Sequence, residues 1–170
     1  TLFLDEIGDI TPAMQVKLLR VIQEKTFEPL GATKSVEHNV RIIVATNKIL
    51  EELVKQGRFR EDLFYRINVF KITLPPLRER MEDIPLLCEH FIGRFNTIQK
   101  NDISGISDEA MAVLMGYNYP GNIRELANII ERAFILCKSG FIEKKHLPES
   151  LFLVSANTAS PDDISLKNME

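Results

Sequence analysis

The sequence has 170 residues, of which 45% are hydrophobic and 26% charged, and its formal net charge at pH 7 is -3. This ordinary globular composition is enough for one medium core or two small ones, and the acidic balance argues against a generally basic nucleic-acid-binding surface. No apolar run approaches the ~20 residues of a membrane span, no signal peptide is visible, and both cysteines lack metal-site spacing. These features favour reduced, buried thiols in a cytoplasmic protein without a membrane partner.

An apolar run at the start of the chain, Leu2 to Leu4, ends directly in two adjacent acids, Asp5 and Glu6. This pattern predicts a strand of a parallel sheet that is buried on both faces and carries the acids to the crevice where open α/β sheets bind ligands. There Asp5 can help to hold Mg²⁺, and Glu6 can polarise an attacking water. The alternative is that both acids only begin the next turn. Because Thr1 already lies in this strand, we expect the chain to be the later part of a larger domain.

A helix is predicted from Thr11 to about Gln23, because Thr11 suits the N-cap, Pro12 suits the first helical position, and the following apolar residues have helical spacing. The pattern breaks from residue 24 to 39, which predicts a loop or an irregular hairpin. A second strand buried on both faces is predicted at Val40–Thr46, again with polar residues at its C-terminal end.

Asn47 follows this second strand and has two interpretations. Parallel strands joined through a helix share one crevice at their carboxyl ends, so Asp5, Glu6 and Asn47 are expected to converge there. Asn47 also suits the N-cap of the next predicted helix, residues 48–56, and capping alone would explain its residue type. The two roles are not exclusive.

The segment Gly57–Ile67 is dense in arginine. Arg58, Asp62 and Arg66 have the (i, i+4) spacing of exposed ion pairs, each worth only a few tenths of a kcal/mol. The functional alternative is that one or two of the guanidinium groups reach a phosphate, because arginine offers planar, bidentate and permanently charged donors.

A third strand is predicted at Val69–Leu74, where two prolines end it. After it the apolar period becomes helical. Helices are predicted at about 83–100, from Ser107 onward, and from Asn122 up to Gly140. Their predicted buried faces include Ile98 and Leu136.

Arg124 lies in the first turn of the last predicted helix, where the helix dipole disfavours a cation by ~0.3–1 kcal/mol. Asn122 and Glu125 form a pair that resembles a capping box at the same end. A bound phosphate would cancel the charge conflict, and an ion pair with Glu125 or a neighbouring acid is the alternative. Beyond Leu153 the sequence is polar and predicts a flexible linker.

Several motifs follow one another in a specific order, namely TLFLDEIGD at 1–9, VRIIVATN at 40–47, FREDLFYR at 59–66, LPPLRER at 74–80 and PGNIREL at 120–126. Over roughly residues 1–151 they closely resemble the AAA+ central domain of sigma-54-dependent transcriptional activators, the NtrC-like enhancer-binding proteins. The resemblance implies an α/β fold with three parts. Residues 1–76 would be the C-terminal part of a P-loop AAA+ parallel-sheet ATPase subdomain, residues 77–151 an all-α lid subdomain, and residues 152–170 a flexible linker toward a DNA-binding domain.

The same resemblance implies roles for the polar residues after the strands. Asp5 matches the family's Walker B position that binds Mg²⁺, and Glu6 matches the position that activates the attacking water. Thr46 and Asn47 match sensor I. Residues 27–37 resemble the insertion before sensor I, which responds to nucleotide.

The resemblance also implies roles for the arginines. Arg60 and Arg66 match a pair of arginine fingers supplied in trans across a ring interface, and Arg124 matches the sensor II arginine of the lid. Some family features are absent from the sequence, namely the glycine-rich phosphate loop, the GAFTGA loop and a helix-turn-helix. Tyr119 stands where the family usually has Trp.

The function that the resemblance implies is ATP hydrolysis, with ATP and Mg²⁺ as cofactors, by a homo-oligomeric ring such as a hexamer. The ring would remodel the sigma-54 RNA polymerase closed complex in the bacterial cytoplasm, in a two-component system, while a domain absent here contacts enhancer DNA. The 170 residues alone are expected to be inactive, because they lack the phosphate loop. Two alternatives are a non-catalytic AAA+-like scaffold or regulatory binding module, and another AAA+ remodelling ATPase.

Overall fold

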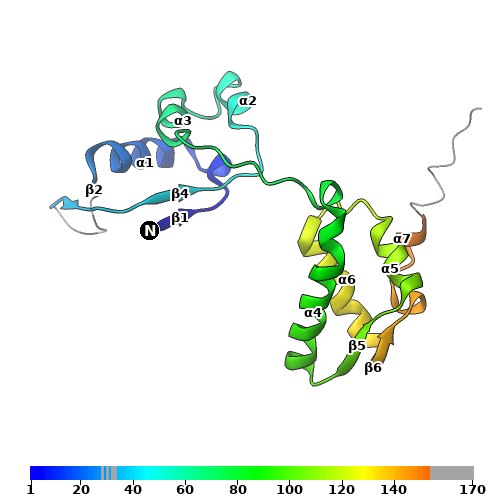
Figure 1. Ribbon diagram of the computed structural model, residues 1–170. Coiled ribbons are helices and arrows are strands. Elements are labelled where there is room, and N and C mark those ends of the chain that lie inside the picture. The colour runs from blue at the N-terminus through cyan, green and yellow to red at the C-terminus, as the bar shows by residue number, and fades with distance from the viewer. Residues whose placement is uncertain (28, 30, 32–33, 154–170) are drawn as a thin grey trace, which may run out of the picture. The chain divides into compact units, whose positions relative to one another are not determined.

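The described residues fold into two compact units, which are divided between Thr73 and Leu74 (Figure 1). The computed structural model describes residues 1–27, 29, 31 and 34–153. Each unit has a separate cluster of buried apolar side chains, so each is stabilised by a hydrophobic core of its own.

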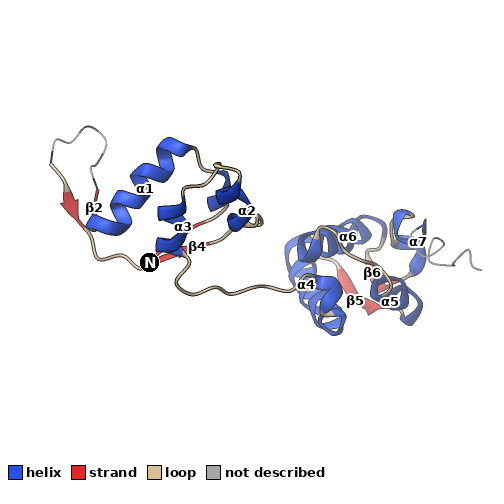
Figure 2. Ribbon diagram, turned by 90° about the horizontal axis from the view of Figure 1, so that it is seen from above, coloured by secondary structure: helices blue, strands red, loops and turns tan. Residues whose placement is uncertain are grey.

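The first unit is built on a short parallel sheet. Strand β1 (Leu2–Leu4) pairs in parallel with β4 (Ile42–Val44), which confirms the predicted parallel sheet. The other regular elements of its layered part are a 3-10 turn (Ile7–Asp9), α1 (Pro12–Glu24), α2 (Leu50–Lys55) and α3 (Glu61–Ile67). Figures 1 and 2 show α1 and α3 side by side over the sheet, and the two helices contact each other. The core between these layers consists of Ile7, Leu19, Leu53, Phe59 and Leu63.

Helix α1 begins and ends as its sequence predicts. The hydroxyl of Thr11 accepts a hydrogen bond from the Met14 amide at 3.3 Å, and Pro12 occupies the first turn. The helix ends at Lys25, whose left-handed backbone places its N–H on the carbonyl of Val21. Both ends of this helix therefore have some of their backbone groups satisfied by residues next to them in the sequence.

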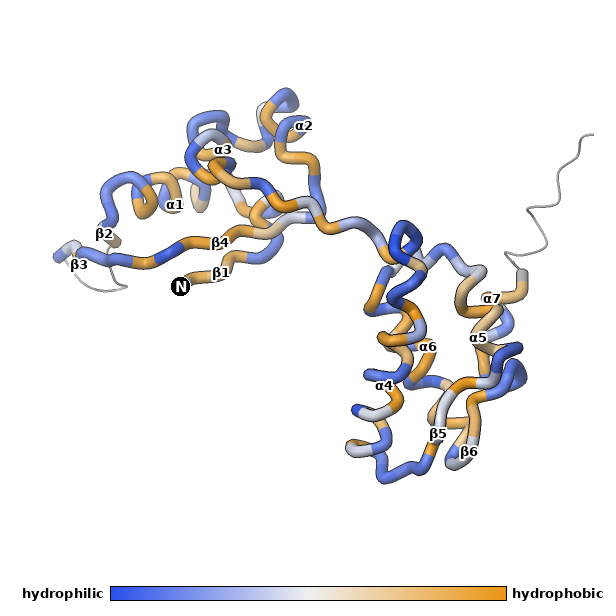
Figure 3. The backbone as a smooth tube through the Cα atoms, viewed as in Figure 1, coloured by the Kyte–Doolittle hydropathy of each residue, from blue (hydrophilic) through white to orange (hydrophobic). Residues whose placement is uncertain are grey.

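The prediction that both strands are buried on two faces is wrong. Phe3 and Ile43 lie opposite each other in the sheet and are 58% and 40% exposed. In the described part of the first unit the helices cover one face of the sheet, so alternate side chains point away from the core. Figure 3 shows that both strands are hydrophobic along their length. Hydrophobicity alone does not indicate whether helices cover one face of a strand or both, and the prediction failed for this reason.

The prediction of a third strand at residues 69–74 is also wrong. The backbone there forms no strand, and its apolar side chains are among the most exposed in the described chain, with Val69 at 84% and Phe70 at 83%. A strand forms only when a neighbouring strand accepts and donates its backbone hydrogen bonds, and none in the described residues does so.

The segment that breaks the pattern after α1 contains a small hairpin. Strand β2 (Thr26–Phe27) pairs antiparallel with β3 (Val36–Glu37). The rings of Phe27 and His38 lie 6.2 Å apart, and the His38 ring also contacts the end of α1 at Val21. Residues 28, 30 and 32–33 of the predicted insertion lie outside the described residues.

The second unit is mainly helical and closely packed. Its α-helices are α4 (Ile84–Gln99), α5 (Asp108–Met115), α6 (Asn122–Leu136) and α7 (Ser150–Leu153). Its 3-10 turns are Leu77–Glu79, Met81–Asp83 and Lys144–His146. The unit also contains a short parallel pair, β5 (Asp102–Ile106) with β6 (Ser139–Ile142), which the sequence interpretation did not include.

The helix faces of the second unit follow the predicted pattern except near the helix ends. Leu126, Ile130 and Phe134 of α6 are fully buried, and Ser107 caps α5 by accepting from the Ala110 amide at 3.3 Å. Ile98 and Leu136, which were expected to be buried, are 63% and 60% exposed. Both lie in the last turn of their helices, where a helix can extend beyond the core that it packs against.

Candidate functional site

The acids after β1 lie directly beside the polar residues after β4. The Ala45 amide donates to the Leu4 carbonyl at 2.9 Å, and the Ala45 carbonyl accepts from the Ile7 amide at 3.0 Å. Asp5 and Glu6 are the two residues between these hydrogen bonds. The structure therefore brings them to the same edge of the sheet as Thr46 and Asn47, the residues that follow Ala45.

The backbone of Glu6 has an unusual conformation. Its φ of 53° and ψ of 40° are left-handed, which costs a residue with a side chain about 1–2 kcal/mol. Its amide donates to a carboxylate oxygen of Asp5 at 2.9 Å, and both acids are exposed while Ile7 is buried. The turn thus sends Ile7 into the core and leaves two carboxylates on the edge of the sheet. Strain of this kind persists where the surrounding structure holds it, and it is common at functional sites.

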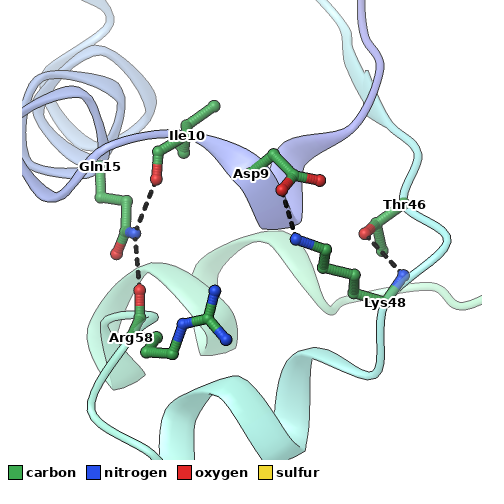
Figure 4. A network of polar contacts seen from close by, with 6 residues as sticks. All are labelled: Asp9, Ile10, Gln15, Thr46, Lys48 and Arg58. Carbon is green, nitrogen blue, oxygen red and sulfur yellow. Dashed lines mark hydrogen bonds and ion pairs between the residues drawn. The ribbon is translucent and has the colours of Figure 1, made fainter.

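The turn after the acids is locked to the loop after β4. Figure 4 shows Asp9 and Lys48 as an ion pair, with the Thr46 hydroxyl accepting from the Lys48 amide at 3.1 Å. Gly8 lies so close to this loop that a β-carbon built on it would be 2.9 Å from the Thr46 hydroxyl oxygen. The turn after Glu6 and the loop after β4 are therefore in close contact, and no room is left for a side chain at Gly8.

The capping role considered for Asn47 is wrong. Helix α2 begins at Leu50, and its N-cap is Ile49, which makes no side-chain capping hydrogen bond. The side chain of Asn47 is exposed at the edge of the sheet. The interpretation that places this amide near a ligand stays a prediction.

The arginine segment forms a different ion pair from the ones expected. Two hydrogen bonds join Arg60 and Asp62, from Nε to Oδ1 at 3.0 Å and from Nη2 to Oδ2 at 2.7 Å. These bonds raise the pKa of Arg60 and lower the pKa of Asp62. The expected pairs of Asp62 with Arg58 and with Arg66 are not formed, and the Asp62 carboxylate instead accepts from the Arg60 guanidinium and the Leu63 amide. Arg66 is exposed in the last turn of α3 and has no ion pair within the described residues.

A buried glutamine joins the acid turn to the arginine segment, and the sequence interpretation missed it. Gln15 in α1 is 1% exposed. Its amide nitrogen donates to the carbonyls of Ile10 at 3.2 Å and Arg58 at 3.0 Å, and its oxygen accepts from the Arg60 amide at 2.9 Å. The signal that could have found it is its spacing, since Gln15 precedes the buried Leu19 by four residues and so lies on the same helix face.

Arg124 belongs to the second unit, in the first turn of α6, and it is exposed. The expected ion pair with Glu125 is not formed. Glu125 instead accepts from the Gly121 amide at 2.8 Å and from the Tyr117 hydroxyl at 2.9 Å, which raises the pKa of Tyr117. The predicted capping pair of Asn122 with Glu125 is therefore wrong, because the N-cap is Gly121 and Glu125 bonds the amide of that residue. The side chain of Asn122 accepts from the Leu77 amide at 2.8 Å.

The carboxylates at the sheet edge fit one kind of metal site. In the described residues no group of three or more His, Cys, Asp or Glu side chains could enclose a metal ion. Mg²⁺ does not need such a cage, because it keeps several waters and is commonly held by one or two carboxylates together with phosphate oxygens. Asp5, exposed and with one oxygen engaged by the Glu6 amide, fits that role.

Two family profiles match the chain in order. The profile described as the Sigma-54 interaction domain matches residues 1–73, and the profile of the AAA+ ATPase lid domain matches residues 78–163. The chain belongs to the NtrC-like sigma-54 activator family. Asp5, Glu6, Thr46, Asn47 and the arginines of α3 lie within the first matched range, and Arg124 lies within the second.

The chain is similar to two longer proteins that are named here. The nitrogen fixation protein AnfA of Azotobacter vinelandii is 51% identical over 151 residues, which cover 89% of this chain and 28% of AnfA. The transcriptional regulatory protein ZraR of Salmonella typhimurium is 47% identical over 164 residues, which cover 96% of this chain and 37% of ZraR. The chain thus spans about a third of the length of these relatives.

Solved structures of a related protein have the same fold. NtrX from Brucella abortus in complex with ADP matches with a TM-score of 0.81 and 36% identity, covering 95% of this chain and 38% of NtrX. NtrX in complex with ATP matches with a TM-score of 0.77 and 38% identity, covering 91% of this chain and 37% of NtrX. Among the described helices of this chain, none combines the length and apolar character needed to cross a membrane.

The contact between Gly8 and Thr46 gives a first prediction. Gly8→Ala is expected to destabilise the first unit by about 1–3 kcal/mol, because the new methyl group forces the two loops apart. Urea unfolding followed by circular dichroism measures the effect. Adding Thr46→Ala removes the clashing hydroxyl, so the double variant should lose less stability than the sum of the single variants.

Gly93→Ala is the matched control. Gly93 lies inside α4 with open space where a β-carbon would stand, so the same substitution should stabilise the second unit by about 0.5–1 kcal/mol. Equal and small effects at the two glycines would contradict the close approach of the loops.

Proposed function

We propose that this chain carries part of an ATP-hydrolysing domain which, in a longer protein, couples hydrolysis to remodelling of the sigma-54 RNA polymerase closed complex. The observation that carries the proposal is the pairing of Ala45 with Leu4 and Ile7, which places Asp5 and Glu6 beside Thr46 and Asn47 in a member of this family. Acids and a polar amide on one edge of a parallel sheet are among the groups that bind a metal-bound triphosphate.

The acids would divide the chemistry between them. Asp5 would help to hold Mg²⁺, which when bound neutralises charge on the phosphates. Glu6 would accept a proton from the attacking water, and its left-handed backbone keeps that carboxylate at the edge of the sheet. Thr46 and Asn47 would sense the phosphate end of the nucleotide. Thr46 would do so from the loop that Gly8 touches.

The arginines would stabilise charge on the transferring phosphoryl group. Arg60 and Arg66 lie on the exposed start and end of α3, which suits donation to the nucleotide of a neighbouring copy in a ring. Asp62 holds the Arg60 guanidinium by two hydrogen bonds, so a phosphate must compete with that carboxylate. Arg124, exposed in the first turn of α6, would contact the nucleotide from the lid.

The proposed organisation and partners follow from the same family. Residues 1–76 would form the later part of the ATPase subdomain, residues 77–151 the lid, and residues 152–170 a linker toward a domain that binds enhancer DNA. The crystal structures of NtrX with ADP and with ATP support nucleotide binding by this fold. ATP and Mg²⁺ would be the cofactors, sigma-54 RNA polymerase the partner, and the bacterial cytoplasm the location.

Replacing Glu6 tests the role of the water-activating acid. In the full natural chain, Glu6→Gln should still bind ATP but hydrolyse it at least about 100-fold more slowly, because the amide cannot accept the proton of the attacking water. Steady-state phosphate release and ATP binding are measured in parallel. Glu24→Gln, the same change at the exposed end of α1, should leave both quantities unchanged. Normal hydrolysis by Glu6→Gln would instead favour a non-catalytic scaffold.

Replacing Arg66 tests donation across a ring. In the full natural chain, Arg66→Ala should reduce turnover at least about 100-fold although the acids of the same copy are intact, because the neighbouring nucleotide loses its guanidinium. ATPase assays on rings that mix this variant with unaltered chains should show partial activity. Arg58→Ala is the matched control, since the carbonyl of Arg58 and not its side chain makes the contact to α1. A turnover for Arg66→Ala equal to that of the control would refute the assignment.

The 170 residues alone should be catalytically inactive. They contain no glycine-rich phosphate loop with its Lys and Ser or Thr, so nothing in the sequence grips the β- and γ-phosphates. The measurement is phosphate release by the purified 170-residue chain with ATP and Mg²⁺. Hydrolysis that depends on Mg²⁺ and is lost with Glu6→Gln would contradict this expectation.

A further inference from the structure

Among the polar and charged residues that the structure describes, Gln15 is the one that is buried. Both the nitrogen and the oxygen of its side-chain amide form hydrogen bonds. The nitrogen donates to Ile10 and Arg58, and the oxygen accepts from the Arg60 amide, at 2.9 to 3.2 Å. A buried amide is costly unless its hydrogen bonds are made, so these contacts hold one geometry. Figure 4 shows the Gln15 side chain reaching from α1 between the carbonyls of Ile10 and Arg58.

The partners of Gln15 are backbone groups of two segments that both carry candidate site residues. Ile10 immediately follows the 3-10 turn that begins after Glu6. Arg58 and Arg60 flank Phe59, which is 3% exposed, so the backbone on both sides of this buried ring is fixed to α1. The hydrogen bond to the Arg60 amide fixes the backbone of the N-cap residue of α3, while the Arg60 guanidinium is bonded separately to Asp62.

The arginine segment has a second attachment, which separates positioning from folding. The amides of Arg58 and Phe59 donate to the Leu53 carbonyl at 2.9 and 3.1 Å. Phe59 also packs with Leu53 and Leu63 in the core. Loss of the Gln15 contacts would therefore loosen the start of α3 while these other contacts keep it attached.

We infer that Gln15 is a positioning residue that fixes the Arg58–Arg60 backbone relative to the acid turn, so that Arg60 is presented correctly to the nucleotide of a neighbouring copy. The inference rests on the proposed function, because it assumes that Arg60 acts in trans. It adds that one buried amide bonds both the residue after the acid turn and the backbone of the arginine segment, in addition to their shared apolar core.

The test replaces the amide by an apolar side chain of similar shape in the full natural chain. Gln15→Met removes all three hydrogen bonds, and a displaced arginine should lower kcat by at least about 10-fold while the KM for ATP of the same copy changes little. Gln23→Met, the same substitution at an exposed position of α1, is the control and should leave kcat unchanged. A kcat for Gln15→Met equal to that of the control would overturn the inference.

Mixed rings separate arginine placement from damage to the acids of the same copy. Rings of Gln15→Met alone and of Glu6→Gln alone should both be poorly active. When the two chains are mixed equally, about a quarter of the interfaces join intact acids to a correctly held arginine, and activity should rise toward about a quarter of the normal value. Absence of recovery would show that Gln15 supports the acids of its own copy and would overturn the inference.

The same mixing with Arg60→Ala in place of Gln15→Met tests the assumption about Arg60. Recovery with Arg60→Ala but not with Gln15→Met overturns the inference and leaves the proposed function standing. Absence of recovery with Arg60→Ala overturns donation in trans and this inference together. If Gln15→Met does not fold by circular dichroism, Gln15→Glu replaces it. That variant keeps an acceptor for the Arg60 amide but places a carboxylate next to the carbonyl oxygens of Ile10 and Arg58, where it cannot donate a hydrogen bond. The outcomes given for Gln15→Met apply to it unchanged.

Discussion

The site depends on the backbone hydrogen bonds by which Ala45 joins β4 to both sides of the acid turn. Both Leu4 and Ile7 are bonded to Ala45. The chain must therefore leave the sheet at Asp5 and Glu6, which lie between Leu4 and Ile7 in the sequence, and these acids lie beside Thr46. The left-handed backbone of Glu6 follows from this constraint, since the chain must turn at once to place Ile7 in the core. The backbone hydrogen bonds of the parallel pair thus set where the two acidic residues leave the sheet, and no side-chain contact is needed for this.

Much of the fold was predictable because it follows from local chemistry. The Thr11 cap, the proline after it and the helical spacing of the second unit need only neighbouring residues to take effect. The predictions failed where a distant partner decides the outcome. Residues 69–74 have strand-forming side chains but no strand beside them in the described chain, and Asn122 bonds Leu77 instead of capping its own helix. Gln15 was missed for the same reason, since its partners include backbone groups of residues 58 and 60.

In both units a side-chain amide forms a hydrogen bond to the backbone near the start of the helix that carries a candidate arginine. In the first unit the amide of Gln15 receives the backbone N–H of Arg60, at the start of α3. In the second unit Asn122, the first residue of the helix that carries Arg124, receives the backbone N–H of Leu77. In both cases a side-chain amide ties backbone that is distant in sequence, which orients a helix without using the charged group at its surface.

The burial of both cysteines has a practical consequence for the study of motion. Cys88 is 1% exposed and Cys137 is 5% exposed, both are free thiols, and burial raises the pKa of Cys88 to about 12. Thiol-reactive dyes attack the exposed thiolate, so neither native residue should compete for label in the folded protein. Fluorophores on cysteines introduced at exposed positions, one in each unit, would then report the separation of the two units by energy transfer without background from the native thiols.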